Sequence, residues 1–176
     1  MRKIEILTKP EQVVFDSPPN LSTTEQTNYF TLTTEVENWV KTMSSPTYMV
    51  GFILLWGYVR CKGKFFQPKS FLESDINFIC EKFNFTLADI DLSTYNQRTF
   101  NYHKQKIRQY LQILPLDEAT VQIFEEIIRD KVSKYQSPKY ILLEVADIIK
   151  NRKIEIPGYN RFTAVISSAW ANLKLI

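Results

Sequence analysis

The sequence predicts an all-α protein of about eight to ten helices. Helical spacing of apolar residues recurs along the chain, whereas the apolar-polar alternation of a strand is almost absent. Only four of the 176 residues are glycine, which favours long regular elements over a loop-rich fold. With 44% hydrophobic and 14% aromatic residues, the chain has enough apolar surface for a buried core. Its length suits one sizeable domain or two small ones.

The first third of the chain contains three clear helix starts. The segment Thr8–Glu11 combines a capping threonine, a proline in the first turn and a glutamate at the third helical position. It predicts a short helix. Thr33 or Thr34 caps a second helix, EVENWVKTM. Ser45-Pro46 begins a strongly apolar helix, TYMVGFILLWGYVRCKG.

The apolar run from Tyr48 to Val59 is the longest in the chain, yet it is well short of the ~20 residues that span a bilayer. It therefore predicts a fully buried helix of a soluble protein. The N-terminal segment MRKIEILTKPEQ has no apolar stretch of the kind found in secretory signals. A cytoplasmic location without membrane contact is expected.

The rest of the chain continues the helical pattern. Further helices are predicted from Glu73 to Asn84, over residues 96–112, from about Asp117 to Tyr135, from Ser137 to about Asn151, and from Pro157 to about Lys174. Short connections of this kind are typical of helix-turn-helix-like clusters. The segment Cys61–Leu72, rich in Lys, Gly, Gln and Pro, is the predicted boundary between two such clusters. The predicted domains are residues 1–64 and residues 65–176.

The formal net charge is only +3, but it is unevenly distributed. Residues 60–116 contain nine Lys and Arg against five acids, whereas residues 1–59 contain four against six. Two acid-free windows, Asn38–Leu72 and Leu92–Leu116, contain basic residues but no Asp or Glu. A basic stripe on a balanced chain is typical of a protein that binds a polyanion. The alternative is an ordinary solvated surface with uneven charge.

The segment NQRTFNYHKQKIRQYLQ, residues 96–112, is the most informative part of the sequence. At about 100° per residue, its apolar side collects Phe100, His103, Ile107, Tyr110, Leu111 and Leu114. The opposite side collects Arg98, Asn101, Tyr102, Gln105, Arg108, Gln109 and Gln112. A solvated helix usually mixes Glu with Lys, so an exposed face of Asn, Gln and Arg needs a reason. The amide side chains suit adenine edges, arginine suits guanine edges, and an acid would repel phosphate. A polar face that binds nothing is the alternative.

Catalytic motifs are missing from the sequence. The one histidine, His103, falls on the apolar side of its helix, and the chain has no Gly-rich phosphate loop and no Cys/His cluster. Cys61 and Cys80 match no metal spacing and are expected to be buried, reduced thiols. We therefore expect a non-enzymatic chain without metal or cofactor. An enzyme would require a pair of carboxylates that converges only in the fold.

Five blocks of the sequence carry a family resemblance. They are ILTKPEQVVFDSPP, NYFTLTTEVENWV, VGFILLWGYVRCKGKF, RTFNYHKQKIRQYLQILPL and LLEVADIIKNRKIEIPGYNRF. In this order and spacing, the chain resembles the N-terminal domain of replicative transposases of the Tn-three family over nearly its whole length. The apolar block is similar to the family's LGFALQLCYLRYPG, with Gly51, Phe52, Leu55, Arg60 and Gly63 in register. Thr99 and His103 match a Thr-Arg-x-x-His pattern, and Ile156 to Gly158 match Leu-Pro-Gly.

The resemblance implies a bacterial DNA-binding module that recognises the terminal inverted repeats of a transposon. Its partners would be double-stranded DNA and other domains or subunits of the transposase. The resemblance places the family's catalytic carboxylates in a large C-terminal domain, so we expect none of them among these 176 residues. The chain departs from the family pattern at Phe100, where an Arg is usual, and at Gln112, where a Gly is usual.

The interpretation as a DNA-binding module assigns roles to named residues. Base-edge contacts are expected from Arg98, Asn101, Gln105 and Arg108. Phosphate contacts are expected from Lys62, Lys64, Lys69, Lys104 and Lys106. A weaker candidate is the start of the last helix, at Tyr159, Asn160 and Arg161, for which simple helix capping is the alternative.

A helical scaffold that docks other transposase domains is the second hypothesis. The acidic first 59 residues fit it better than they fit DNA. Trp39, Trp56 and Trp170 would then matter wherever they are exposed, because exposed aromatic side chains mark protein interfaces.

Overall fold

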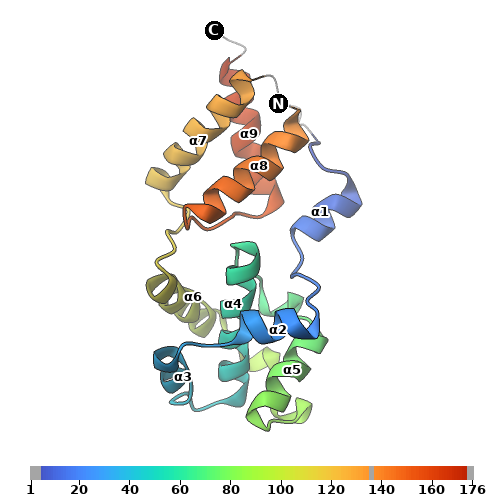
Figure 1. Cartoon of the computed structure of the whole chain (residues 1–176), viewed down its shortest axis with the longest axis vertical. Coiled ribbons are helices and arrows are strands. Elements are labelled where there is room, and N and C mark those ends of the chain that lie inside the picture. The colour runs from blue at the N-terminus through green and yellow to red at the C-terminus, as the bar shows by residue number, and fades with distance from the viewer. Residues whose placement is uncertain (1–4, 135–136, 174–176) are drawn as a thin grey trace. The chain divides into compact units, whose positions relative to one another are not determined.

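The computed structural model describes residues 5–134 and 137–173, and in this part of the chain helices are joined by short loops (Figure 1). The α-helices are α1 (Lys9–Phe15), α2 (Thr23–Phe30), α3 (Thr34–Val40), α4 (Pro46–Lys62), α5 (Glu73–Phe83), α6 (Gln97–Leu111), α7 (Glu118–Ser133), α8 (Pro138–Asn151) and α9 (Tyr159–Leu173). Three short 3₁₀ helices are η1 (Pro68–Ser70), η2 (Leu87–Asp89) and η3 (Leu92–Thr94). The described residues form no strand beyond one isolated bridge between Leu114 and Ile154, which confirms the all-α class.

The chain divides into two compact units, and the division differs from the predicted one. The central unit is Pro18–Gln112, and the terminal unit combines the described residues of Met1–Ser17 and Ile113–Ile176. The predicted boundary between residues 64 and 65 falls inside the central unit. There the ring of Tyr58 packs on Phe66 and Phe71, with centroids 5.8 and 6.0 Å apart. The segment after residue 64 therefore belongs to the same core as α4.

The central unit is built around α4. Every side chain from Met49 to Val59 is buried, because α2, α5 and α6 all pack against this helix. The predicted burial of the run from Tyr48 to Val59 is thus confirmed except at Tyr48, which is half-buried. Two glycines permit the close packing. A Cβ at Gly57 would overlap the buried ring of Phe30 in α2, and a Cβ at Gly51 would lie 2.8 Å from the ring of Tyr95.

A buried polar network fixes α2 and α5 on α4. The carboxylate of Asp75, 1% exposed, accepts hydrogen bonds from the Gln26 amide at 2.8 Å and the Tyr58 hydroxyl at 2.5 Å. Burial and the neighbouring carboxylate raise the pKa of Tyr58, so its hydroxyl stays a proton donor. A buried carboxylate is costly unless it is hydrogen-bonded, and these neutral donors supply that stabilisation.

In the terminal unit, α7, α8 and α9 pack against one another. Their core is formed by Phe124, Ile128, Ile141, Leu142, Val145, Phe162 and Ile166, together with Ile6 and Leu7 from the start of the chain. Residues far apart in sequence thus share one core. The segments before α7 and after α8 are joined at Leu114, whose backbone N–H donates to the Lys153 carbonyl at 2.8 Å and whose carbonyl accepts the Glu155 N–H at 2.9 Å.

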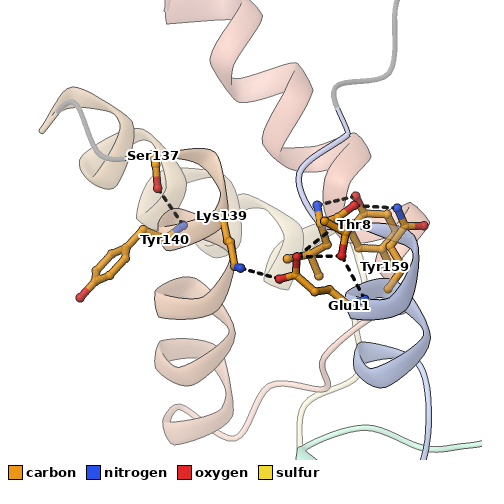
Figure 2. Close-up of polar contacts among 8 residues, drawn as sticks. Thr8, Glu11, Ser137, Lys139, Tyr140 and Tyr159 are labelled. Atoms are coloured by element: carbon orange, nitrogen blue, oxygen red, sulfur yellow. Dashed lines mark hydrogen bonds and ion pairs between the residues drawn. The ribbon is translucent and has the colours of Figure 1, made fainter.

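Polar contacts attach the N-terminal segment to this unit (Figure 2). The Tyr159 hydroxyl accepts hydrogen bonds from the backbone N–H groups of Ile6 and Leu7, both at 3.1 Å. The Glu11 carboxylate pairs with the Lys139 ammonium at 2.5 Å, which joins α1 to the first turn of α8. The same pairing lowers the pKa of Glu11.

Most predicted elements are present, with shifted ends. The capping box of Thr8 and Glu11 begins α1, and Thr33 caps α3. Helix α9 begins at Tyr159 rather than Pro157. The predicted helix ends at Tyr135 and Lys174 lie outside the described residues.

Helix α2 is absent from the sequence-based prediction. It begins with a capping box in which Ser22 and Glu25 bond each other's backbone N–H groups. The pattern Ser-x-x-Glu was therefore a usable signal.

Within residues 5–134 and 137–173, no helix combines the length and apolarity that a membrane crossing requires.

We expect Gly57→Ala to lower the free energy of unfolding of the central unit by about 1–3 kcal/mol, because the new methyl group overpacks against the ring of Phe30. Urea unfolding followed by circular dichroism measures this change. The double variant Gly57→Ala/Phe30→Leu should recover part of the loss, because the smaller side chain leaves room. A neutral or stabilising Gly57→Ala would contradict the close packing of α2 on α4.

Candidate nucleic-acid interface

Helix α6 has well-defined ends. The Asn96 side chain caps it by accepting the backbone N–H of Thr99 at 2.9 Å. It ends at Gln112, which adopts the left-handed conformation with φ 56° and donates its N–H to Arg108. Because the helix stops there, Leu114 is 49% exposed, which corrects its prediction as a core residue.

The inner face of α6 holds a buried histidine. Phe100, His103 and Ile107 are at most 3% exposed, which confirms the predicted burial of His103. Its Nδ1 shares a 2.5 Å hydrogen bond with the Tyr95 hydroxyl. The rings of Trp39, Tyr48, Phe52, Tyr95 and Tyr102 surround it. Burial lowers the pKa of His103 to about 4, so the imidazole is neutral at pH 7 and packs within this aromatic cluster.

The outer face of α6 presents polar side chains to solvent. We call Arg98, Asn101 and Gln105 the α6 strip, and all three are exposed. Gln97 donates a hydrogen bond to the Asn101 side chain at 3.0 Å, which orients that amide. Residues 97–111 contain no Asp or Glu. The strip therefore offers donors and amide acceptors without negative charge.

Cations flank the α6 strip on both sides and lie against aromatic rings. On one side, the Lys106 ammonium is 5.7 and 5.9 Å from the ring centroids of Trp39 and Tyr102. On the other, the Arg108 guanidinium is 5.2 Å from the Phe65 ring, and the Lys104 ammonium is 4.4 Å from the Phe100 ring. These contacts limit the freedom of long side chains while leaving the charge in place.

The ring contacts also bring the two acid-free windows together. Trp39 and Phe65 belong to the first window, and α6 belongs to the second. Trp39 packs on one side of α6 and Phe65 lies under Arg108 on the other. Two basic segments that are separated in the sequence thus meet in the central unit.

Three predicted phosphate contacts lie outside α6, and they differ in exposure. Lys69, in η1, is exposed. Lys62, in the last turn of α4, is half-buried, and that burial lowers its pKa. Lys64 is only 5% exposed, and its ammonium lies 5.9 Å from the Phe66 ring. The left-handed turn at Gly63 ends α4, and the chain packs inward after it, so Lys64 does not serve as the predicted surface cation.

The second candidate region, at the start of α9, belongs to the terminal unit. Tyr159 is buried, and its backbone N–H donates to the Asp16 carboxylate at 2.9 Å. Asn160 and Arg161 are exposed, but Arg161 donates to the backbone carbonyl of Leu116 at 3.3 Å. Capping and loop attachment account for the contacts of Tyr159 and Arg161.

The aromatic residues expected at a protein interface are not fully exposed. Trp56 is 3% exposed and donates its indole N–H to the Thr31 carbonyl at 3.2 Å. Trp39 and Trp170 are half-buried. Tyr102 is 49% exposed on the outer face of α6, and the sequence-based site list did not include it.

Chemically reactive groups are sparse in the described part of the chain. No three His, Cys, Asp or Glu side chains converge there as a metal site would require. Cys80 is buried as predicted, but Cys61 is half-buried, and the two cysteines form no disulfide. The carboxylates of Glu126 and Asp130 lie one turn apart on α7 beside a surface hollow. Asp130 pairs with Lys134 at 3.1 Å, as a solvated helix face does.

Replacing Gln112 with glycine should stabilise the central unit by about 1 kcal/mol, because glycine adopts the left-handed conformation without the steric cost of a Cβ. Gln109→Gly is the matched control. It lies within α6 and should destabilise by about 1 kcal/mol. Chemical denaturation of both variants measures the two effects. A loss of stability in Gln112→Gly would contradict the assigned helix end.

The stability of the central unit should depend on His103 between about pH 6.5 and pH 4. The folded pKa lies below the ordinary value, so the unfolded chain binds the proton first, and stability falls as pH falls through this window. The loss should reach about 2–3 kcal/mol. His103→Gln cannot take up the proton, so the difference in unfolding free energy between the two proteins should vary with pH. A constant difference would contradict a buried neutral imidazole.

Comparison with known families gives one assignment. The family described as "Domain of unknown function (DUF4158)" matches residues 6–169. Comparison with curated proteins gives no match. The match extends over both units of the structure and nearly all of its helices. The chain therefore belongs to the DUF4158 domain family.

Proposed function

We propose that the chain is a sequence-specific duplex DNA-binding module of a transposase and that it recognises transposon terminal inverted repeats. The observation that carries the proposal is the α6 strip, a polar face without acids that has Lys106 on one side and Lys104 and Arg108 on the other, each cation lying against an aromatic ring. The resemblance to the N-terminal domain of Tn-three transposases supports it, because that module binds inverted repeats. The role is one of binding, without catalysis or cofactor.

In the proposed complex, α6 lies in the major groove of the duplex. An α-helix fits this groove, and amide and guanidinium side chains bond base edges there. Arg98, Asn101 and Gln105 occupy successive turns, so their tips follow one line along the groove. Lys104 and Lys106 lie to either side, where the phosphates of the two strands run.

Arg108 takes a different role from the one that its sequence position suggests. Its guanidinium lies over the ring of Phe65 at the side of α6, and the residue is half-buried. We assign it to a phosphate contact beside Lys104. Lys69 and Lys62 extend the same set, whereas the buried Lys64 is left out.

Docking of other transposase domains is a second candidate function. It is favoured by α8 of the terminal unit, where Tyr140 and Leu143 are 63% and 47% exposed. Large apolar side chains in solvent are typical of protein interfaces. Apolar docking barely responds to salt, whereas the affinity of phosphate contacts falls steeply as salt rises, so a salt titration separates the two functions.

Gln105→Ala should weaken binding to the cognate repeat by about 1–3 kcal/mol and leave binding to a scrambled duplex nearly unchanged, because a base-edge contact is lost. Lys106→Ala should weaken both and flatten the slope of log affinity against log salt by about one. Fluorescence anisotropy with duplexes that carry the candidate inverted repeats measures both.

The matched control is Gln122→Ala, an exposed glutamine on α7 of the terminal unit, which should change neither affinity. Equal losses on cognate and scrambled DNA for Gln105→Ala would restrict α6 to phosphate contacts. Base recognition would then be sought at Asn160 and Arg161. An absence of duplex binding at low salt would overturn the proposed function itself.

A further inference from the structure

One apolar group stands out on the outer face of α6. The ring of Tyr102 is 49% exposed, although the rings that it contacts belong to the buried cluster around His103. It is one helical turn from Arg98 and one turn from Lys106, and three residues from Gln105. Its exposed edge therefore lies among the side chains assigned to base and phosphate contacts.

The ring of Tyr102 is held in place from behind. Its centroid lies 6.2 Å from Trp39 and 6.3 Å from His103, and the Lys106 ammonium is 5.9 Å away. Trp39 is itself fixed against Phe52, with centroids 5.1 Å apart. A tyrosine has few rotatable bonds, so such support leaves a rigid apolar surface whose ordering costs little on binding.

The chemistry of the major groove defines what this surface fits. Base edges there present hydrogen-bond donors and acceptors, together with one apolar group, the C5-methyl of thymine. The α6 strip supplies partners for the polar groups, and Tyr102 supplies an apolar partner. We propose that Tyr102 contacts a thymine C5-methyl in the bound duplex and is a specificity-determining residue. This inference rests on the proposed function, since it requires α6 to lie in the groove.

Replacing single thymines with deoxyuridine tests the contact, because it removes one methyl group and keeps every hydrogen-bonding atom of the base. For the unaltered protein, deoxyuridine in place of thymine at one position of the cognate repeat should lower the affinity about fourfold, as expected for burial of one methyl group. Tyr102→Ala should lower affinity for the thymine duplex and abolish the response at that position. Tyr102→Phe should keep the response, because the ring makes the contact.

Gln105→Ala is the control within α6. It should lower affinity yet keep the fourfold response, because a base-edge bond and a methyl contact act at separate atoms. Thermal unfolding of Tyr102→Phe and Tyr102→Ala checks that the aromatic cluster is intact. If the alanine variant loses stability, the contact is judged on Tyr102→Phe, which retains the ring.

The outcomes separate the two proposals. If the unaltered protein prefers the cognate repeat to the scrambled duplex but tolerates deoxyuridine at every position, the Tyr102 inference is wrong and the proposed function stands. A response that persists in Tyr102→Ala also overturns it, because another group then contacts the methyl. If the protein has no preference for the repeat, both proposals fail together.

Discussion

Helix α4 has no face suited to water, and the central unit is organised by that constraint. Apolar side chains surround the helix axis, so α2, α5 and α6 must cover it on different sides. Gly57 and Gly51 let Phe30 and Tyr95 approach the helix closely. Once α6 is packed in this way, its inner face is committed to the core. The opposite face, which carries the α6 strip, is therefore left exposed to solvent.

The aromatic cluster around His103 joins the core to the proposed interface. Trp39 contacts Phe52 of α4 and His103 of α6, and it also lies beside Lys106 and Tyr102 on the surface. The same ring therefore stabilises the fold and positions two groups of the proposed DNA contact. A change at Trp39 would alter stability and binding together, whereas changes at the exposed Gln105 act on binding alone. Substitutions in the strip are for this reason the cleaner probes of function.

Sequence patterns within single helices predicted which side chains of those helices are buried and which are exposed. The apolar run identified α4 as buried, and the helical angle placed His103 inside and Gln105 outside. The division into units could not be predicted in the same way, because it depends on pairs such as Asp16 with Tyr159, which are 143 residues apart. The burial of Lys64 likewise depends on how the chain packs after Gly63, and a lysine in the sequence does not predict such burial.

The residues that carry the family resemblance have structural explanations. Gly51 leaves room for the ring of Tyr95. Arg60 of α4 donates to the backbone carbonyls of Asn28 and Tyr29 in α2. Gly63 adopts φ 74° at the end of α4. His103 bonds Tyr95 within the core. These groups specify the fold of the central unit and leave its surface undetermined. Under the proposed function, recognition of one DNA sequence rather than another would come from side chains that the fold does not require. On α6 those are the strip residues Arg98, Asn101 and Gln105, which are exposed.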